Sequence, residues 1–491
     1  MILSMPAKPQ SRRKQNTMAP SAPPTKAPSR ASPRLTASAL EQLGAARLAA
    51  FLIAQAEGDP VLARSLRLEL AGADSTTRLA AEVDKRLRTI QRSRSLVDWA
   101  KVRPLAREID SLREAVAGPL AAASPRMAAE QMRRLLELAG GIFERSDDGS
   151  GTLGEAFRTV GAALGQVWSQ LPDRKPADLA RELLAILDAD GYGAADRLLE
   201  AASPALGPDG RSELRRLLLI RLAASPPMRS ASGYDTSPDR REALRHLRDL
   251  ADLDGDVDAF IVAIEALDHP EFFAGEVAER LLKHQRPAEA LAWLDRAPDR
   301  LADKALRLAD LRIAALDTLG RKEEAHTLRW ATFCRWLSAP HLKAHLRTLT
   351  GFDDVEAEQR ALDHALGHAD RNLALAFLVA WPDLTAANRL VQAQVGAMDP
   401  RDYHRLRPAA EALAERYPAA AALLHRALAE DVLRRAASKN YPYAARDVQS
   451  CARLADRLPD EESFESHAAF VARLRREHPR KSGFWTLVPA G

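Results

Sequence analysis

The sequence predicts an all-α protein, with an N-terminal helical domain followed by a tetratricopeptide-like α-solenoid of helical hairpins. Aromatic residues make up only 5% of a chain that is 46% hydrophobic, so the core is expected to consist mostly of Ala, Leu and Val, which suits packed helices better than sheets. Apolar residues recur with helical spacing along most of the chain, and almost nothing alternates with the period of a strand. A hairpin pattern in the second half also recurs after 35 residues, as in helical repeat proteins.

Residues 1–36 differ in composition from the rest of the chain. They contain seven prolines, seven Lys or Arg and no acid, so we expect a disordered basic tail. The N-terminus has no apolar run of signal-peptide length, and no segment reaches the roughly 18–20 apolar residues of a membrane span. The two cysteines, Cys334 and Cys451, stand alone in the sequence and favour a reducing compartment. We therefore expect a cytoplasmic protein without membrane contact.

The N-terminal helical domain is expected over residues 37–225. Its first helix is predicted to begin after Thr36 or Ser38 and to end at Gly58, ahead of Asp59 and Pro60. A second helix is predicted near 61–71. Ser75 is expected to cap a third, whose apolar stripe comprises Leu79, Val83, Leu87 and Ile90. Further helices are predicted near 105–117, 125–144, 152–170, 176–189 and 211–223.

Residues 226–240 are rich in Pro, Ser and Gly, which predicts a linker to a second domain over 241–491. In that domain, Leu281–Pro298 has the pattern of a helix end, a tight bend and a second helix. Thirty-five residues later, Leu316–Phe333 repeats it. Arg321 and Glu324 align with Arg286 and Glu289, and Gly320 falls in the bend opposite Gln285.

A period near 34 with a bend followed by Glu-Ala is typical of tetratricopeptide-type hairpins. The match is partial, because Arg329 stands where the first copy has Leu294. Such hairpins cannot cover their own apolar faces, so they stack and leave a long concave surface that usually binds another chain.

The common catalytic motifs are absent from the sequence. There is no phosphate-binding G-x-x-x-x-G-K-[ST], no strand-linked G-x-G-x-x-G and no G-x-S-x-G. Two acidic runs, Ser146–Gly151 and Asp252–Asp258, lack the ligand spacing of a calcium loop. We interpret both as turns between helices with Asp caps, and we predict no cofactor.

Four histidines are the candidates for a metal site. His341 and His345 are four residues apart, as are His364 and His368, so each pair would lie on one helix face. The acidic segment 352–358 between the pairs could complete a site. The alternative is that these histidines are solvated residues on a helix face.

The segment 85–107 is the strongest charge feature, with eight basic residues against the single acid Asp98. If it binds phosphates or an acidic partner, the residues that flank Trp99 are the candidates. The alternative is an Arg-covered helix whose side chains pack by their stems and pair with acids elsewhere in the fold. The candidate polyanion-binding residues are Arg86, Arg88, Arg92, Arg94, Lys101 and Arg103. A similar choice arises at the C-terminus, where we expect the apolar residues of "GFWTLV" to dock into the last hairpin.

Several segments together resemble an uncharacterised bacterial helical family, a domain of unknown function. They are "LAGADSTTRLAAEVDKRLRTIQRSRSLVDW", "FERSDDGSGTLGEAF", "FDDVEAEQRALDHAL", "ALAFLVAWP" and "HPRKSGFWTLV". The family markers carry no assigned chemistry, so the resemblance implies no functional residues. The stretch "LLHRALAEDVLRRAASKNYPYAARDV" also resembles the helical region of some bacterial proteins with a SWIM zinc finger. The Cys-x-Cys and Cys-x-His ligands of that finger are absent here.

The leading hypothesis is a non-enzymatic protein–protein interaction scaffold that binds a partner segment on the helical-repeat surface. A second hypothesis is nucleic-acid or polyanion binding through residues 85–107 and the tail. A third is a cryptic metal-dependent enzyme that uses the two histidine pairs.

Overall fold

The computed structural model describes residues 35–171, 174–228, 235, 237–298, 304–458 and 464–488. The predicted tail lies outside these residues except for Leu35 and Thr36. Within the described residues the regular secondary structure is helical, and the β-structure is limited to isolated bridge residues, such as the parallel bridge between Val97 and Ser146. The all-α prediction is therefore confirmed. No helix in this part of the chain is both long and apolar enough to cross a bilayer.

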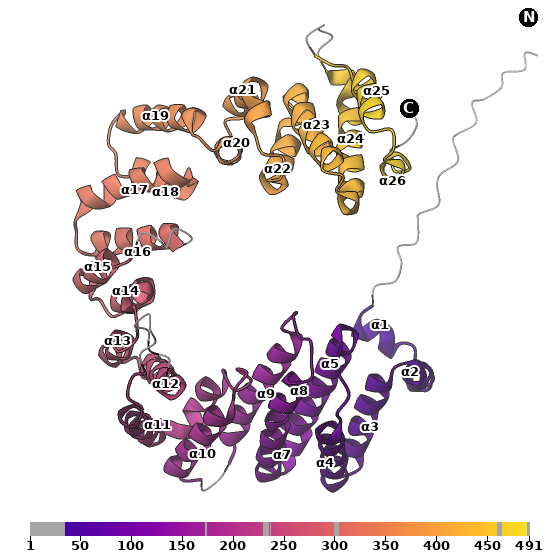
Figure 1. The fold of residues 1–491 in the computed structure, drawn as a ribbon, viewed down its shortest axis with the longest axis vertical. Coiled ribbons are helices and arrows are strands. Elements are labelled where there is room, and N and C mark those ends of the chain that lie inside the picture. Colours follow the sequence, from indigo (N-terminus) through magenta and orange to yellow (C-terminus); the bar gives the residue numbers. More distant parts are fainter. Residues whose placement is uncertain are drawn as a thin grey trace, which may run out of the picture. The chain divides into compact units, whose positions relative to one another are not determined.

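The helices form two compact units (Figure 1). The first comprises the chain up to Lys175 together with Glu182–Ala205, and the second comprises Pro176–Arg181 together with Leu206–Gly491. The described residues of the predicted linker (226–228, 235 and 237–240) belong to the second unit, and the other residues of this segment lie outside the described ones.

The first unit is built from helical layers around a core that includes Val83, Ile109, Leu112 and Phe157, all essentially inaccessible to solvent. Helices α10 (Pro176–Ala189) and α11 (Leu198–Ala224) each contribute residues to both units. The remaining helices of the first unit are α1 (Ala37–Glu41), α2 (Ala45–Gly58), α3 (Pro60–Asp74), α4 (Thr76–Arg92), α5 (Trp99–Ala115), the π-helical turn η1 (Val116–Leu120), α6 (Ala121–Ala123), α7 (Pro125–Glu137), α8 (Ala139–Phe143) and α9 (Thr152–Trp168).

The prediction of one continuous helix before Gly58 was wrong. Gly44 has a positive φ of 79° with ψ of 151° and separates α1 from α2, a conformation that glycine reaches without steric cost. The predicted caps were better placed. Thr36 accepts a hydrogen bond from the Ala39 amide, and Ser75 accepts one from the Arg78 amide.

Three other predicted helices have different bounds. Helix α5 begins six residues before the predicted start, because Asp98 caps it and Pro104 is accommodated within its first turns. The helix predicted over 125–144 is divided at Leu138 into α7 and α8. The helix predicted over 211–223 is the second half of α11, whose backbone is kinked at Gly207.

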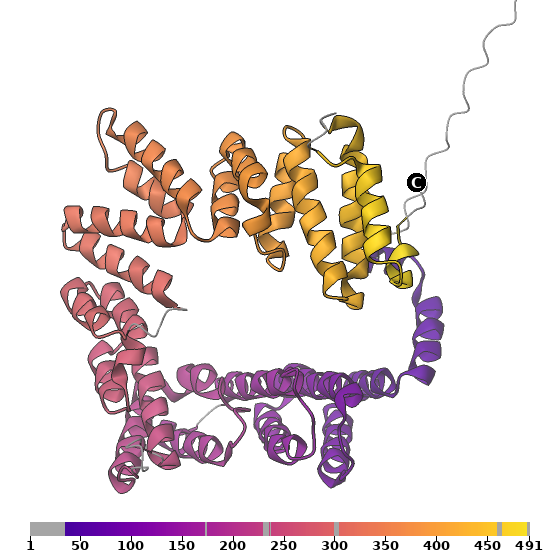
Figure 2. The same ribbon diagram turned by 45° about the horizontal axis from the view of Figure 1, so that its top comes forward.

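The second unit contains a succession of antiparallel helix pairs in chain order (Figure 2). Its core comprises several hydrophobic clusters that each span successive helices, and alanine supplies much of the largest one, as the composition predicted. After α11 its helices are α12 (Pro238–Asp254), α13 (Val257–Glu265), α14 (Ala274–Lys283), α15 (Pro287–Asp295), α16 (Ala305–Thr318), α17 (Lys322–Trp336), α18 (Ala339–Leu346), α19 (Asp353–Gly367), α20 (Arg371–Ala380), α21 (Leu384–Gln394), α22 (Tyr403–Leu413), α23 (Pro418–Arg434), α24 (Tyr441–Leu454), α25 (His467–Glu477) and α26 (Ser482–Trp485).

The hairpin bends repeat one geometry. In the predicted pair of repeats, the Arg286 amide donates to the Leu281 carbonyl at 2.8 Å, and the Arg321 amide donates to the Leu316 carbonyl at 2.9 Å. A residue with a left-handed backbone precedes each of these arginines, as in a helix C-cap of the Schellman type. The bend between α12 and α13 has the same form, with Gly255 in the left-handed position. The structural repeat therefore includes at least one hairpin beyond the two that the 35-residue repeat in the sequence predicted.

Ion pairs and one histidine–carboxylate hydrogen bond join the first helices of successive hairpins. Arg280 of α14 binds Asp252 of α12 through two bonds of 2.6 and 2.7 Å, and this contact holds the pKa of the Asp252 carboxyl below its ordinary value. Arg307 of α16 binds Glu279 of α14 at 2.6 Å. His341 of α18 is 2.7 Å from Asp310 of α16. Much of the acid and arginine content of this unit thus pairs between neighbouring repeats.

Candidate functional site

Five of the eight basic residues in segment 85–107 are paired with acids of the first unit. Arg86 forms an ion pair with the buried Glu108, which also accepts from Arg64 at 3.0 Å. Arg88 pairs with Asp84 at 2.8 Å. Lys85, Lys101 and Arg107 pair with Glu82, Asp98 and Asp59, respectively. This arrangement matches the interpretation of an Arg-covered helix that is neutralised within its own fold.

Three candidate residues of the segment remain exposed without an ion-pair partner among the described residues: Arg92, Arg94 and Arg103. They lie near the end of α4 and the start of α5, beside Leu96 and Trp99, which are 70% and 80% exposed. Arg86 points inward instead. The structure therefore does not present the six predicted residues as one basic surface.

The side chains of the first histidine pair have hydrogen-bond and packing partners within the fold. His341 contacts the Ser338 hydroxyl with Nδ1 and the Asp310 carboxylate with Nε2, both at 2.7 Å. His345 is buried and stacks on His326 at 3.9 Å between ring centres. Burial of the side chain is the main cause that lowers the pKa of His345, and the nearby His326 is the second cause. Its ring therefore serves packing.

The second histidine pair has local partners as well. His364 Nε2 lies 2.9 Å from the Cys334 carbonyl, and His368 Nδ1 accepts from the Asp370 amide at 3.1 Å. Within the described residues, no group of three or more His, Cys, Asp or Glu is arranged to hold a metal ion. The structure does not bring the two candidate pairs together into one site.

Both acidic runs serve local structure, as their interpretation as turns predicted. The Asp148 carboxylate accepts from the Gly154 amide at 3.0 Å at the start of α9. Asp256 caps α13 by accepting from the Ala259 amide at 2.9 Å. Asp254 and Asp258 pair with arginines of neighbouring helices.

A buried polar network joins three helices near the C-terminal end of the second unit. Asp447 of α24 is 2% exposed and accepts from Arg407 of α22 at 2.7 Å. It also lies 2.9 Å from Nδ1 of the buried His425 of α23. Cys451, one turn further along α24, is fully buried, and burial raises the pKa of its thiol to about 12. This thiol is therefore not a nucleophile near neutral pH.

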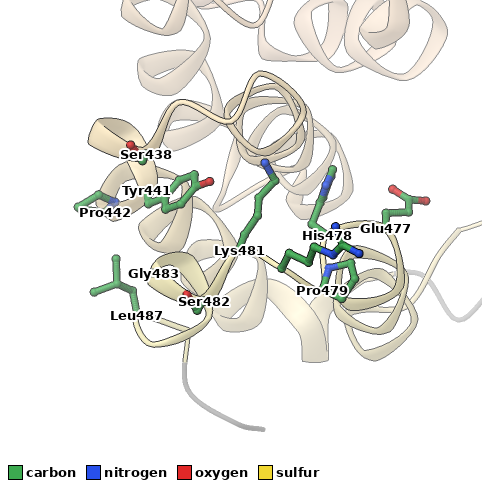
Figure 3. Close-up of a pocket in the computed structure, with 11 residues that line it drawn as sticks. Ser438, Tyr441, Pro442, Glu477, His478, Pro479, Lys481, Ser482, Gly483 and Leu487 are labelled. Atoms are coloured by element: carbon green, nitrogen blue, oxygen red, sulfur yellow. The ribbon is translucent and has the colours of Figure 1, made fainter.

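The most distinctive open site is a groove at the C-terminal end, which sequence reasoning did not single out. It measures about 850 Å³ and lies between the start of α24 and the turn that joins α25 to α26 (Figure 3). Figure 3 shows Tyr441 on one side and His478 on the other, with Lys481 between them. The lining is completed by Ser438, Pro442, Glu477, Pro479, Arg480, Ser482, Gly483 and Leu487.

One side of the groove is held in place because the C-terminal aromatic residues pack onto the last hairpin, as predicted. Phe484 is fully buried and meets the Tyr441 ring edge-on at 6.0 Å. Trp485 donates from Nε1 to the His478 carbonyl at 2.9 Å. Val488 is also buried, whereas Leu487 is 41% exposed at the groove. These contacts fix the turn that carries the basic side chains.

The charge of the groove is positive. Arg480 and Lys481 have no ion-pair partner among the described residues. The acid of the lining, Glu477, is already 3.6 Å from Arg473. His478 contributes little charge at neutral pH, because burial and then the nearby Lys481 lower its pKa. The run "HPRKSG" was the signal in the sequence, but its charges could be placed in a groove only once α24 was known to lie beside it.

The fold defines a protein of the helical-hairpin repeat class, with no metal cluster in the described residues. The chain belongs to a family of unknown function, DUF6880, whose model matches residues 30–487. The resemblance to an uncharacterised family is thus confirmed, whereas none of the comparisons shows the resemblance to SWIM proteins. A comparison with curated proteins found no match.

Among solved structures, one that is similar to this chain is described as a circular tandem repeat protein with novel repeat topology and enhanced subunit contact surfaces. The identity is 16%, and the match covers 87% of this chain and 97% of that chain. The TM-score is 0.20. A TM-score this low does not indicate that the two chains share a fold.

Proposed function

We propose that the protein is a non-enzymatic scaffold that binds an acidic segment of a partner protein in the C-terminal groove. The observation that supports this most directly is the pair Arg480 and Lys481, two cations without an acid partner in the described chain, in a groove of about 850 Å³. The hairpin stack gives the general reason, since such arrays are commonly used to bind other chains.

The groove favours a peptide segment over a small metabolite or a nucleic-acid duplex. Its basic residues stand beside apolar surface from Pro442, Pro479 and Leu487. Hydroxyl groups of Ser438, Tyr441 and Ser482 add donors and acceptors for a peptide backbone. A volume of this order accommodates a few residues rather than a double helix. Carboxylates of the segment would pair with Arg480 and Lys481, and its apolar atoms would cover the prolines.

A labelled hexaglutamate peptide tests the proposal, with a hexaglutamine peptide as its neutral counterpart. Fluorescence anisotropy with the full chain should show binding of hexaglutamate alone. The double substitution Arg480→Glu and Lys481→Glu should weaken it at least about tenfold, equivalent to about 1.4 kcal/mol. Arg476→Glu is the matched control, since Arg476 is exposed at the end of α25 outside the groove lining. Equal losses in both variants, or no binding by the wild type, would contradict the proposal.

Polyanion binding by the first unit is a second candidate, supported by the exposed Arg92, Arg94 and Arg103 beside Trp99. A protein that neutralises phosphates loses affinity as salt increases, with a slope of about 0.9 per phosphate contact on B-DNA. Arg92→Glu with Arg94→Glu should lower both the affinity for a 20-base-pair duplex and this slope. Arg88→Glu is the comparison, because Arg88 is already paired with Asp84. Binding that does not depend on salt would rule this function out.

A further inference from the structure

We infer that helix α2 is a self-association surface, on which two copies of the chain pair through antiparallel α2 helices. Ten of the 14 residues of helix α2 are apolar, yet none of the 14 is buried. Phe51 and Ile53 are 61% and 63% exposed, and Leu52 is 39% exposed. A monomeric soluble protein rarely leaves such a continuous apolar helix uncovered.

Helix α3 covers only one side of α2. Leu48 and Ala56 are the half-buried residues of α2. At 100° per residue, Ala50 and Ala54 lie on the opposite face, and both are exposed. Two small residues one turn apart allow a second helix to approach closely.

The charges of α2 oppose its own helix dipole. Its charged residues are Arg47, in the first turn, and Glu57, in the last. A cation at the N-terminus and an anion at the C-terminus are the unfavourable arrangement for an isolated helix. The N-cap, Gly44, supplies no side-chain hydrogen bond either. Neither Arg47 nor Glu57 has an ion-pair partner among the described residues, so their placement has no explanation within one copy of the chain.

An antiparallel second copy of α2 resolves each of these features. With the two-fold axis on the face of Ala50 and Ala54, at the height midway between them, Arg47 of each copy lies level with Glu57 of the other. Phe51 of each copy then lies beside Phe51 of the other on one flank of the interface, and Ile53 lies beside Ile53 on the other flank. Each charge then sits at the end of the neighbouring helix whose dipole favours it. Such self-complementarity is what a two-fold interface requires.

The N-terminal tail does not offer an alternative cover for this surface. Residues 1–34 are rich in proline and basic residues and have few apolar side chains. A segment of this composition cannot match the apolar face of α2, and it has no acid to pair with Arg47. A second copy of α2 supplies both the apolar face and the two charges.

Sedimentation velocity of the full chain, in low salt with a reductant, tests the inference. The wild type should pass from monomer to dimer between about 1 and 100 µM. Arg47→Glu and Glu57→Arg should each weaken dimerisation at least tenfold, because each creates two like-charge contacts across the axis. The double variant R47E/E57R restores both pairs in swapped form and should dimerise within about threefold of the wild type.

The charge reversals do not compromise α2 itself, since each places its new charge at the end of the helix that the dipole favours. Far-UV circular dichroism should therefore be unchanged in all variants. A wild type that stays monomeric at 100 µM would overturn the inference and point to a different partner on α2. Single variants that dimerise like the wild type, or a double variant that is not restored, would overturn it equally.

Discussion

Gln285 and Gly320 occupy the same position in two successive hairpin bends, and both have a left-handed backbone, with φ of 59° and 72°. The next residue in each bend is Arg286 or Arg321, and its amide donates a hydrogen bond to the carbonyl five residues earlier. Its guanidinium also donates two hydrogen bonds to the carboxylate of the glutamate three residues later. The bend is thus built in the same way with a glycine and with a glutamine. The glutamine version bears a backbone cost that the glycine version avoids.

This difference predicts opposite effects of two substitutions. Gln285→Gly should stabilise the second unit by about 1 kcal/mol, because the left-handed conformation disfavours a residue with a Cβ and the Gln285 side chain is exposed. Gly320→Ala should destabilise it by about 1 kcal/mol, although a Cβ there meets no atom within 4 Å. Urea denaturation midpoints measure both changes. A shift of the same sign in both variants would contradict the shared geometry of the bends.

The close approach of α9 to α11 predicts a second, larger effect. A Cβ on Gly165 would lie 2.6 Å from backbone atoms of Ala201 and Ala202, so Gly165→Ala should destabilise the first unit by about 2–3 kcal/mol through overpacking. Gly140→Ala is the matched control in α8, where a Cβ meets nothing within 4 Å. It should be neutral or stabilising by up to about 1 kcal/mol, since alanine favours a helix over glycine. Thermal denaturation of both variants tests this, and similar losses would argue against the contact.

The buried Asp447 should matter far more than an exposed ion pair of similar geometry. Asp447→Asn leaves Arg407 without its carboxylate partner inside the fold, at a cost of about 2–3 kcal/mol. Glu289→Gln removes the solvent-exposed partner of Arg286 and should cost less than about 1 kcal/mol. Chemical denaturation of the two variants should separate these values. Equal losses would mean that burial does not strengthen the Asp447 network.

The thiol of Cys451 should resist alkylation in the folded protein. Burial raises its pKa to about 12, so at pH 8 the reactive thiolate is scarce and the sulfur is inaccessible. Iodoacetamide labelling followed by mass spectrometry should modify Cys451 only after denaturation. Above the unfolded thiol pKa of about 8.5, the unfolded state loses this proton first, so the contribution of Cys451 to stability should fall as pH rises toward 12. Rapid labelling of the native chain at pH 8 would contradict this account.

The fold class could be predicted from the sequence because helical periodicity, caps and breaks are local signals. Ser75 caps a helix where the sequence predicted a helix start, and Asp59 caps one where it predicted a break. The 35-residue spacing of Gln285 and Gly320 corresponds to a real structural repeat. Helix bounds failed where a local signal was ambiguous. Gly44 was read as part of a helix although it breaks one, and Pro104 obscured the earlier start of α5.

The candidate sites depended on contacts between residues distant in the chain, which periodicity does not reveal. Arg86 counted as a basic surface residue until Glu108, 22 residues later, was found to neutralise it. His345 counted as a possible ligand until its stacking on His326 was known. Conversely, Lys481 became a site residue only when Tyr441, 40 residues earlier, was found across the same groove.

Hydrogen–deuterium exchange of the full chain, with and without saturating hexaglutamate peptide, tests the central claim most directly. Binding in the groove predicts slower exchange in two separated segments, the start of α24 near Tyr441 and the turn from His478 to Ser482. The segment from Arg92 to Arg103 should be unchanged. Protection confined to that basic segment, or no protection in either groove segment, would contradict the assignment of the C-terminal groove as the site for acidic partners.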